Sequence, residues 1–220
     1  MKLPKLILAS GSPRRTEILN SVGWEFEKRV ADIDETEFLN EKPADYVQRL
    51  AREKAETIAA HYENALVLGA DTIVVIDGKI IGKPKDLIDA RRMLNMLSGR
   101  WHEVLTGVAL IKKVSGFKFQ VSNQNSTPTN PKQRTKDKGQ RTNKVVGIQR
   151  TRVKFAEMTD AEIEFLVEKG EPLDKAGAYA VQAQAALFIE EIKGDYWNVV
   201  GLPINLVYRL MQTLEQRKTE

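Results

Sequence analysis

Two neighbouring arginines, Arg14 and Arg15, follow a Ser-Gly-Ser-Pro turn at residues 10–13 and stand in the first turn of an expected helix. A helix dipole places partial positive charge at this end, so each arginine is disfavoured there by about 0.3–1 kcal/mol. A bound phosphate would reverse that sign, because free backbone N–H groups, the hydroxyls of Ser10 and Ser12 and both guanidinium groups would point at it. The alternative is two solvated arginines on an exposed turn.

Other charged residues also stand where a purely structural role explains them poorly. Lys54 lies on the apolar side of an expected helix, so it must reach either solvent or a polar pocket. Asp71 comes directly after a buried strand, an edge where α/β proteins commonly bind ligands, although Asp is also frequent in turns. Lys83 ends the next strand. Asp34 and Glu35 form a carboxylate pair that suits Mg²⁺, or else an ordinary solvated acidic loop.

Residues 174–179 and Gln182 lie between an expected helix and an expected strand, and their small residues suggest the wall of a binding site. A glutamine amide carries both a donor and an acceptor, so Gln182 could recognise the edge of a base; the alternative is an ordinary loop. His102 precedes a strand, where a structural hydrogen bond is the expected role. Together, the cations suit a polyphosphate, and the carboxylates suit a divalent ion and a base that activates water.

The composition excludes several kinds of site. The chain has 220 residues, no cysteine and two histidines, which rules out thiolate metal sites, thiol nucleophiles and a histidine-rich metal site. Residues 78–83 do not match a Walker loop, because the spacing of the glycines is one residue short and Pro84 replaces the Ser or Thr. No apolar run approaches the ~20 residues of a membrane span, and nothing directs export. We therefore expect a cytoplasmic protein with no membrane partner.

The basic character of the chain comes from one segment. The net charge is +4, but residues 122–144 hold six Lys or Arg, one acid and no apolar side chain, so they carry +5 and the remainder −1. A domain that coats nucleic acid is therefore not the expected class. We expect a single domain over 1–220 in which residues 122–144 form a mobile polar loop, because their composition cannot offset the entropy of ordering.

Hydrophobic periodicity and turn signals predict an α/β protein, with helices around a mixed sheet. The expected helices are 13–22, 43–62, 87–97, 159–170 and 204–216. The expected strands are 6–9, 66–70, 73–76, 79–81, 104–112, 117–121, 145–155, 187–192 and 196–200, with hairpins at 73–81, 104–121 and 187–200.

The order and spacing of the motifs resemble the Maf family of nucleoside triphosphate pyrophosphatases over nearly the whole chain, apart from residues 122–144. The matching motifs are Ser-Gly-Ser-Pro-Arg-Arg at 10–15, Arg-Glu-Lys-Ala at 52–55, Gly-Ala-Asp-Thr at 69–72, Lys-Pro at 83–84, Ser-Gly with His102 at 98–102, Asp-Lys-Ala-Gly-Ala-Tyr at 174–179, Gln182, and Gly-Asp-Tyr with Asn-Val-Val-Gly-Leu-Pro at 194–203. One departure is Ala180, where members usually carry Gly; if that backbone required a positive φ, alanine would be strained by about 1 kcal/mol.

The resemblance implies an inosine-triphosphatase-like fold, an elongated mixed β-sheet flanked by helices, with two lobes around a central cleft. It implies a homodimer that hydrolyses a nucleoside triphosphate to the monophosphate and pyrophosphate with Mg²⁺ or Mn²⁺, and this chain looks like the dTTP/UTP branch. The implied proton acceptor is Asp71. The positions implied for phosphate binding are Ser10, Arg14, Arg15, Lys54 and Lys83, and those implied for substrate choice are Arg14, Thr72 and Gln182. Glu35 is expected to hold part of the metal ion.

Two alternatives stay open at this point. One keeps the reaction and changes the base, for example to 7-methyl-GTP, CTP or a modified nucleotide. The other is a non-catalytic regulator that binds nucleotide or nucleic acid through the basic segment.

Overall fold

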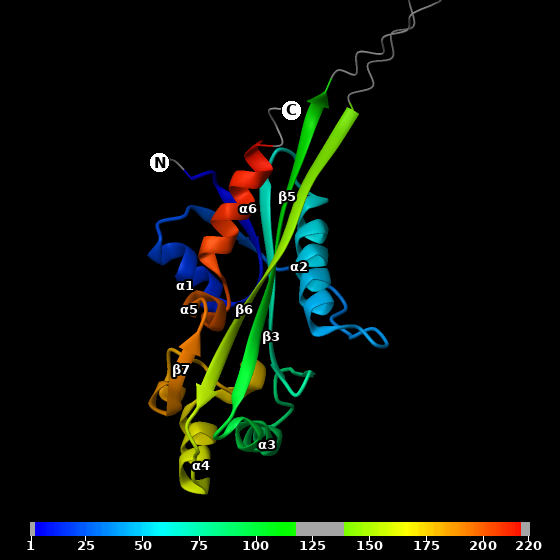
Figure 1. Cartoon of the computed structure of the whole chain (residues 1–220). Helices are drawn as coiled ribbons and strands as arrows, with labels where there is room; N and C mark the ends of the chain where they lie inside the picture. Colours follow the sequence, from blue (N-terminus) through cyan, green and yellow to red (C-terminus); the bar gives the residue numbers. More distant parts are fainter. Residues whose placement is uncertain (1–2, 118–138, 217–220) are drawn as a thin grey trace, which may run out of the picture.

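The structure is a computed structural model that describes residues 3–117 and 139–216 (Figure 1). Its seven-stranded sheet has the order β2-β1-β3-β5-β6-β7, and β4 pairs with the end of β3. β1 runs parallel to β2 and β3, and the other pairs are antiparallel. The strands are β1 Leu6–Ala9, β2 Phe26–Arg29, β3 Leu66–Ile76, β4 Lys79–Ile81, β5 Trp101–Phe117, β6 Gly139–Phe155 and β7 Ile189–Lys193. The predicted mixed α/β sheet is therefore confirmed.

Helices cover both faces of this sheet (Figure 1). They are α1 Pro13–Ser21, α2 Pro43–Ala59, α3 Leu87–Leu97, α4 Asp160–Lys169, α5 Tyr196–Val200 and α6 Ile204–Gln216, with short 3₁₀ helices at Pro172–Asp174, Ala176–Ala178 and Gln184–Phe188. The five helices that the sequence predicts are confirmed to within three residues at each end. Thr159 and Glu162 form a capping box at the start of α4, which satisfies backbone donors that would otherwise be unpaired.

The hydrophobic core is divided in a way that leaves room for a cleft. On one face of the sheet, α1 and α6 pack over Leu66 and Leu68 of β3, whereas α3 and α4 pack over Val74 and Ile76 of the same strand. Alternate residues of a strand share a face, so Thr72 lies between these two clusters. The expected two lobes correspond to these clusters, at the two ends of continuous strands.

Helix α2 covers the opposite face at very short range. Cβ atoms added to Gly69 of β3 and Gly107 of β5 would each lie 2.1 Å from a backbone oxygen of α2, that of Ala51 and that of Val47 respectively. Only glycine therefore permits this approach. These contacts bring the middle of α2 directly onto β3 and its amino-terminal part directly onto β5.

Several expected boundaries are wrong. β3 continues through Asp71 and Thr72, so the two expected strands at 66–70 and 73–76 are one. The expected strand at 196–200 is α5, because the Asp195 carboxylate accepts the Trp197 N–H at 2.8 Å and caps a helical turn. β2 is an additional strand that the sequence analysis does not predict, and only two of its residues are half-buried.

The hairpin expected at 104–121 is also wrong. β5 runs on through Ser115 and Gly116 to Phe117 and pairs with β6, which begins at Gly139 instead of Val145. Residues 139–144 therefore belong to a strand rather than to the predicted loop, and residues 118–138 lie outside the described residues. Beyond Lys112, β5 has no register partner in β3 and continues as a two-stranded ribbon with β6.

Candidate active site

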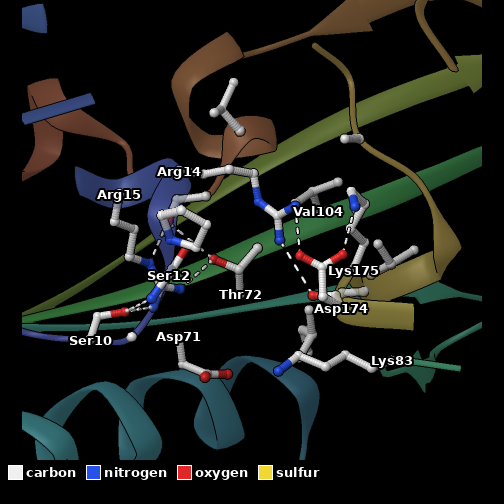
Figure 2. A pocket seen from close by; sticks show the side chains of 18 of the residues that line it. Ser10, Ser12, Arg14, Arg15, Asp71, Thr72, Lys83, Val104, Asp174 and Lys175 are labelled. Atoms are coloured by element: carbon white, nitrogen blue, oxygen red, sulfur yellow. Dashed lines mark hydrogen bonds and ion pairs between the residues drawn. The ribbon is translucent and has the colours of Figure 1, made fainter. Parts of the chain in front are cut away.

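A cavity of about 610 Å³ lies between the two core clusters (Figure 2). Asp34, which the sequence pairs with Glu35 as a possible Mg²⁺ ligand, does not line this cavity, and its Oδ1 accepts hydrogen bonds from the N–H and the hydroxyl of Thr36. The lining does include the nine residues that the family resemblance implies for the site, drawn from segments that are far apart in the chain. These residues are Ser10, Arg14, Arg15, Glu35, Lys54, Asp71, Thr72, Lys83 and Gln182. The predicted convergence of cations and carboxylates on one cavity is therefore observed.

The sheet itself opens toward this cavity. β1 pairs with β3 only up to Leu68, and β4 pairs with β3 only from Val74 onward. Among the described residues, no strand adjoins this side of β3 between those two points. Asp71 and Thr72 thus stand at an open strand edge, with side chains on opposite faces of the sheet. Both line the cavity although neither follows the end of a strand.

Lys54 forms the centre of an ion-pair network on the α2 face. Its Nζ lies 2.6 Å from Asp71 Oδ1 and 2.6 Å from Glu35 Oε1. Burial raises the pKa of the Asp71 carboxyl, while Lys54 and Arg15 oppose that increase. Lys54 thus reaches a polar pocket rather than solvent, as one of its two sequence interpretations predicts. The buried carboxylate of Asp71 is a stronger base than an exposed aspartate.

Arg15 is buried and is held by three segments of the chain. Its Nε donates to Gly201 O at 2.9 Å, its Nη1 to Ser10 Oγ at 2.9 Å and its Nη2 to Thr72 Oγ1 at 3.0 Å. Burial lowers the pKa of Arg15, and the nearby Asp71 charge opposes this. Arg15 therefore places a positive charge in the cavity wall and also fixes the hydroxyls of Ser10 and Thr72.

Arg14, by contrast, reaches across the cavity. Its Nη2 donates to the backbone oxygen of Asp174 at 3.4 Å, and its Nη1 lies 3.7 Å from the Asp174 carboxylate. Lys175 Nζ contacts the same carboxylate at 2.6 Å (Figure 2). Lys83 and Gln182 are both exposed and line the cavity. Figure 2 shows the Lys83 side chain extending toward the part of the cavity where Asp71 lies.

The wall formed by residues 174–183 accommodates Ala180 without left-handed backbone. Positive φ occurs instead at Gly177 (70°) and Ala178 (65°). A Cβ on Gly177 would lie 2.9 Å from Cγ2 of Val74, so both its φ and its surroundings require glycine. The strain considered for Ala180 is therefore absent.

Only two carboxylates face one another across Lys54. Among residues 3–117 and 139–216, no three His, Cys, Asp or Glu side chains gather as a potential metal centre. Mg²⁺ commonly binds through one or two carboxylates, with substrate phosphates and water as its other ligands. Glu35 and Asp71 fit such a partial donor set, because their oxygens already meet at one cation, the Lys54 ammonium.

Tyr46 is a cavity residue that the sequence analysis misses. It lines the cavity, and its hydroxyl donates to the backbone oxygen of Glu35 at 2.8 Å. Burial raises the pKa of Tyr46 to about 12, so the phenol stays protonated. Its spacing of eight residues from Lys54 puts both on one side of α2 and is the signal that could have identified it.

His102 is confirmed as a structural residue. Its Nε2 lies 2.7 Å from the hydroxyl of Tyr179, and its ring stacks at 5.5 Å on Phe155. Burial lowers the pKa of His102 to about 4, so the ring is neutral at physiological pH.

The description "Maf-like protein" belongs to a family model that matches residues 5–214. A dTTP/UTP pyrophosphatase of Bacillus cytotoxicus is 42% identical over 97% of this chain and 96% of its own length. Proteins with the same name from Symbiobacterium thermophilum (97% of this chain, 94% of that protein) and Syntrophus aciditrophicus (97% and 92%) are 43% and 45% identical.

A solved structure of a nucleoside-triphosphatase/dITP/XTP pyrophosphatase from Mycobacterium abscessus is 16% identical, with a TM-score of 0.36, over 70% of this chain and 75% of that one. That similarity is weak. No helix within the described ranges has both the length and the apolar character needed to cross a lipid bilayer. The match over 5–214 and the identities above 40% show that the chain belongs to the Maf family.

Proposed function

We propose that this protein hydrolyses dTTP and UTP to the nucleoside monophosphate and pyrophosphate. The observation that carries this proposal is the convergence of four cationic side chains and the buried Asp71 carboxylate on one cavity. Relatives that share more than 40% of the sequence bear the name dTTP/UTP pyrophosphatase.

Asp71 is the proposed general base. It accepts a proton from a water molecule as the water oxygen bonds to the α-phosphorus, and the bond from that phosphorus to the bridging oxygen breaks as pyrophosphate departs. Its raised pKa and its position at the open edge of β3 support this role.

The triphosphate is proposed to bind against the positive side chains. Lys54 and Arg15 supply charge next to Asp71, Ser10 supplies a hydroxyl, and Arg14 and Lys83 reach the cavity from α1 and from the segment after β4. Fixed donors aimed at developing negative charge stabilise a phosphoryl-transfer transition state without reorganisation at the moment of reaction.

We further propose Glu35, with Asp71, as the protein ligands of Mg²⁺ or Mn²⁺. When bound, this ion supplies charge neutralisation and polarises the phosphoryl oxygens. The Lys54 ammonium contacts both carboxylates, so their oxygens lie close enough together to share one cation.

The choice of base is proposed to depend on Thr72, Gln182 and Arg14. Thr72 is held by Arg15 and by Thr106, whose Oγ1 lies 2.9 Å from Thr72 Oγ1, whereas Gln182 is exposed at the cavity wall. The homodimer implied by the family resemblance and the cytoplasmic location expected from the sequence are proposals as well. Light scattering on a size-exclusion column and cell fractionation test them.

Pyrophosphate release from dTTP, UTP, CTP and 7-methyl-GTP, with and without Mg²⁺, tests the substrate class. Asp71→Asn should lower kcat by about 10²- to 10⁴-fold and leave nucleotide binding largely intact. Glu190→Gln, an acid-to-amide change on the exposed edge strand β7, is the matched control and should keep wild-type turnover. Unchanged turnover in Asp71→Asn would refute the assignment of the base. The non-catalytic regulator would be supported instead if the protein binds nucleotides, releases no pyrophosphate and loses that binding when residues 122–138 are deleted.

A further inference from the structure

Arg49 is a buried arginine of α2 that lies outside the cavity, and its Nε and Nη2 donors hold the segment that precedes this helix. Its Nε and Nη2 each lie 2.7 Å from one oxygen of the Glu41 carboxylate, forming a bidentate pair. Nη2 also donates to the backbone oxygen of Thr36 at 3.0 Å, and Nη1 contacts Glu53 at 3.2 Å. The guanidinium carbon lies 3.9 Å from the centroid of the Phe38 ring.

The ion pair between Arg49 and Glu41 is more deeply buried than most ion pairs in proteins. The side chains of Arg49 and Glu41 are each 8% exposed, and hydrogen bonding by Arg49 lowers the pKa of Glu41. A buried bidentate pair contributes geometric specificity more dependably than net stability.

The contacts of Arg49 determine the path of residues 34–41, which we call the acidic loop. Within it, the Phe38 N–H donates to Glu41 Oε2 at 3.1 Å, so the carboxylate held by Arg49 also fixes the loop backbone. Most of the loop otherwise has little packing: Phe38 is 61% exposed and Leu39 94% exposed. Glu35, which contacts Lys54 in the cavity, stands one residue before Thr36.

We propose that Arg49 is a positioning residue, which holds the acidic loop through Glu41 and Thr36 and thereby places the Glu35 carboxylate at Lys54 and Asp71. This inference rests on the proposed function of Glu35 as a metal ligand. Arg49 does not line the cavity, so its effect on hydrolysis is transmitted through the loop. Tyr46 supports the same backbone through the hydrogen bond from its hydroxyl to the Glu35 carbonyl.

The test compares Arg49→Lys with wild type in two measurements. A lysine has one compact ammonium and cannot reproduce the three-way contact with Glu41 and Thr36. We expect amide hydrogen exchange of residues 34–41 to accelerate at least about tenfold. We also expect the Mg²⁺ concentration for half-maximal pyrophosphate release to rise about 10- to 100-fold, the usual effect of losing an outer contact of a metal ligand.

A second variant and two controls keep the outcome decisive. Glu41→Gln keeps the size of the side chain and removes its charge, so it should change both measurements in the same direction as Arg49→Lys. Arg92→Lys, in an exposed ion pair on α3, should change neither. In an Glu35→Gln background, Arg49→Lys should add less than about twofold to the Mg²⁺ requirement, because its target has already been removed.

The inference is overturned if exchange in the acidic loop and the Mg²⁺ requirement both stay within twofold of wild type in Arg49→Lys and Glu41→Gln. It is equally overturned if Arg49→Lys has its full effect in the Glu35→Gln background. If the wild-type protein hydrolyses no nucleotide, the proposed function fails. The exchange measurement alone then decides whether Arg49 holds the loop.

Discussion

Gly69→Ala should lower kcat/KM by displacing α2 and the Lys54 side chain that it carries, although Gly69 does not line the cavity. Its added Cβ would lie 2.1 Å from the Ala51 oxygen, and ordinary contact begins at 3.4 Å, so α2 must retreat by about 1.3 Å. Lys54 lies on this helix, 2.6 Å from Asp71 Oδ1. If α2 moves back along the line from Lys54 Nζ to Asp71 Oδ1, the distance between these two atoms grows to about 3.9 Å, which is beyond hydrogen-bonding distance.

Two magnitudes follow from this displacement. Overpacking of a core contact costs about 1–3 kcal/mol, which for a chain of this length lowers Tm by about 2–12 °C. A misplacement of about 1 Å in a catalytic arrangement can reduce the rate about 10²-fold. We therefore expect kcat/KM to fall by about that factor at a temperature where the variant is still folded.

The assay is pyrophosphate release at 25 °C, with Tm measured on the same preparations. Ile163→Val, in the buried face of α4 away from α2, is the control for destabilisation and should cost about 0.5–1.5 kcal/mol with unchanged kcat/KM. If Gly69→Ala retained wild-type kcat/KM within twofold, the close approach of α2 would not be what positions Lys54.

Three further predictions concern ionisation. Lys54→Met should move the acid limb of the kcat/KM profile to higher pH, because it removes the charge that opposes the raised pKa of Asp71; Lys83→Met should reduce turnover without moving that limb. The pKa of Asp71 is higher in the folded protein than in the unfolded chain, so the stability of the wild type declines as pH rises from about 3.8 through the folded-state pKa. Asp71→Asn should therefore have a higher Tm than the wild type at neutral pH, and this difference in Tm should disappear below about pH 3.8. His102 should destabilise the wild type by roughly 3 kcal/mol as pH falls from 6.5 to about 4, because only the unfolded chain takes up its proton there. Melts of His102→Gln over that range should show a correspondingly shallower loss, and an identical slope would contradict the assignment.

The site was predictable because its residues suit structural roles poorly. Lys54 interrupts an apolar helix face, and Arg14 and Arg15 oppose a helix dipole, so each required a ligand or a partner that sequence reasoning could name. All three residues line one cavity. The different positions of the two arginines, with Arg15 buried in the cavity wall and Arg14 extended toward Asp174, were not predictable. They depend on Gly201 and Thr72, which approach Arg15 only in the folded chain.

The strand boundaries were less predictable for an equally physical reason. Asp71 and Thr72 carry the composition of a turn, yet backbone pairing with β5 continues through them without a break in register. Hydrogen bonding of the ladder does not depend on side-chain polarity, so a functional pair can interrupt the apolar pattern while the strand continues. The Arg49–Glu41 pair was not predictable for a related reason, since two charged residues eight positions apart, one before α2 and one within it, form no local pattern.

The continuity of β3 beneath the cavity has a consequence for how substrate is admitted. The β3–β5 ladder runs in register from Leu66↔Lys112 to Val75↔Glu103, so any hinge motion between the two core clusters would have to rupture it. The strands therefore stay fixed when a nucleotide binds, and the loops around the cavity are the segments that adjust to it. Free and nucleotide-bound forms should superimpose closely over the strands, with their differences confined to the surrounding loops.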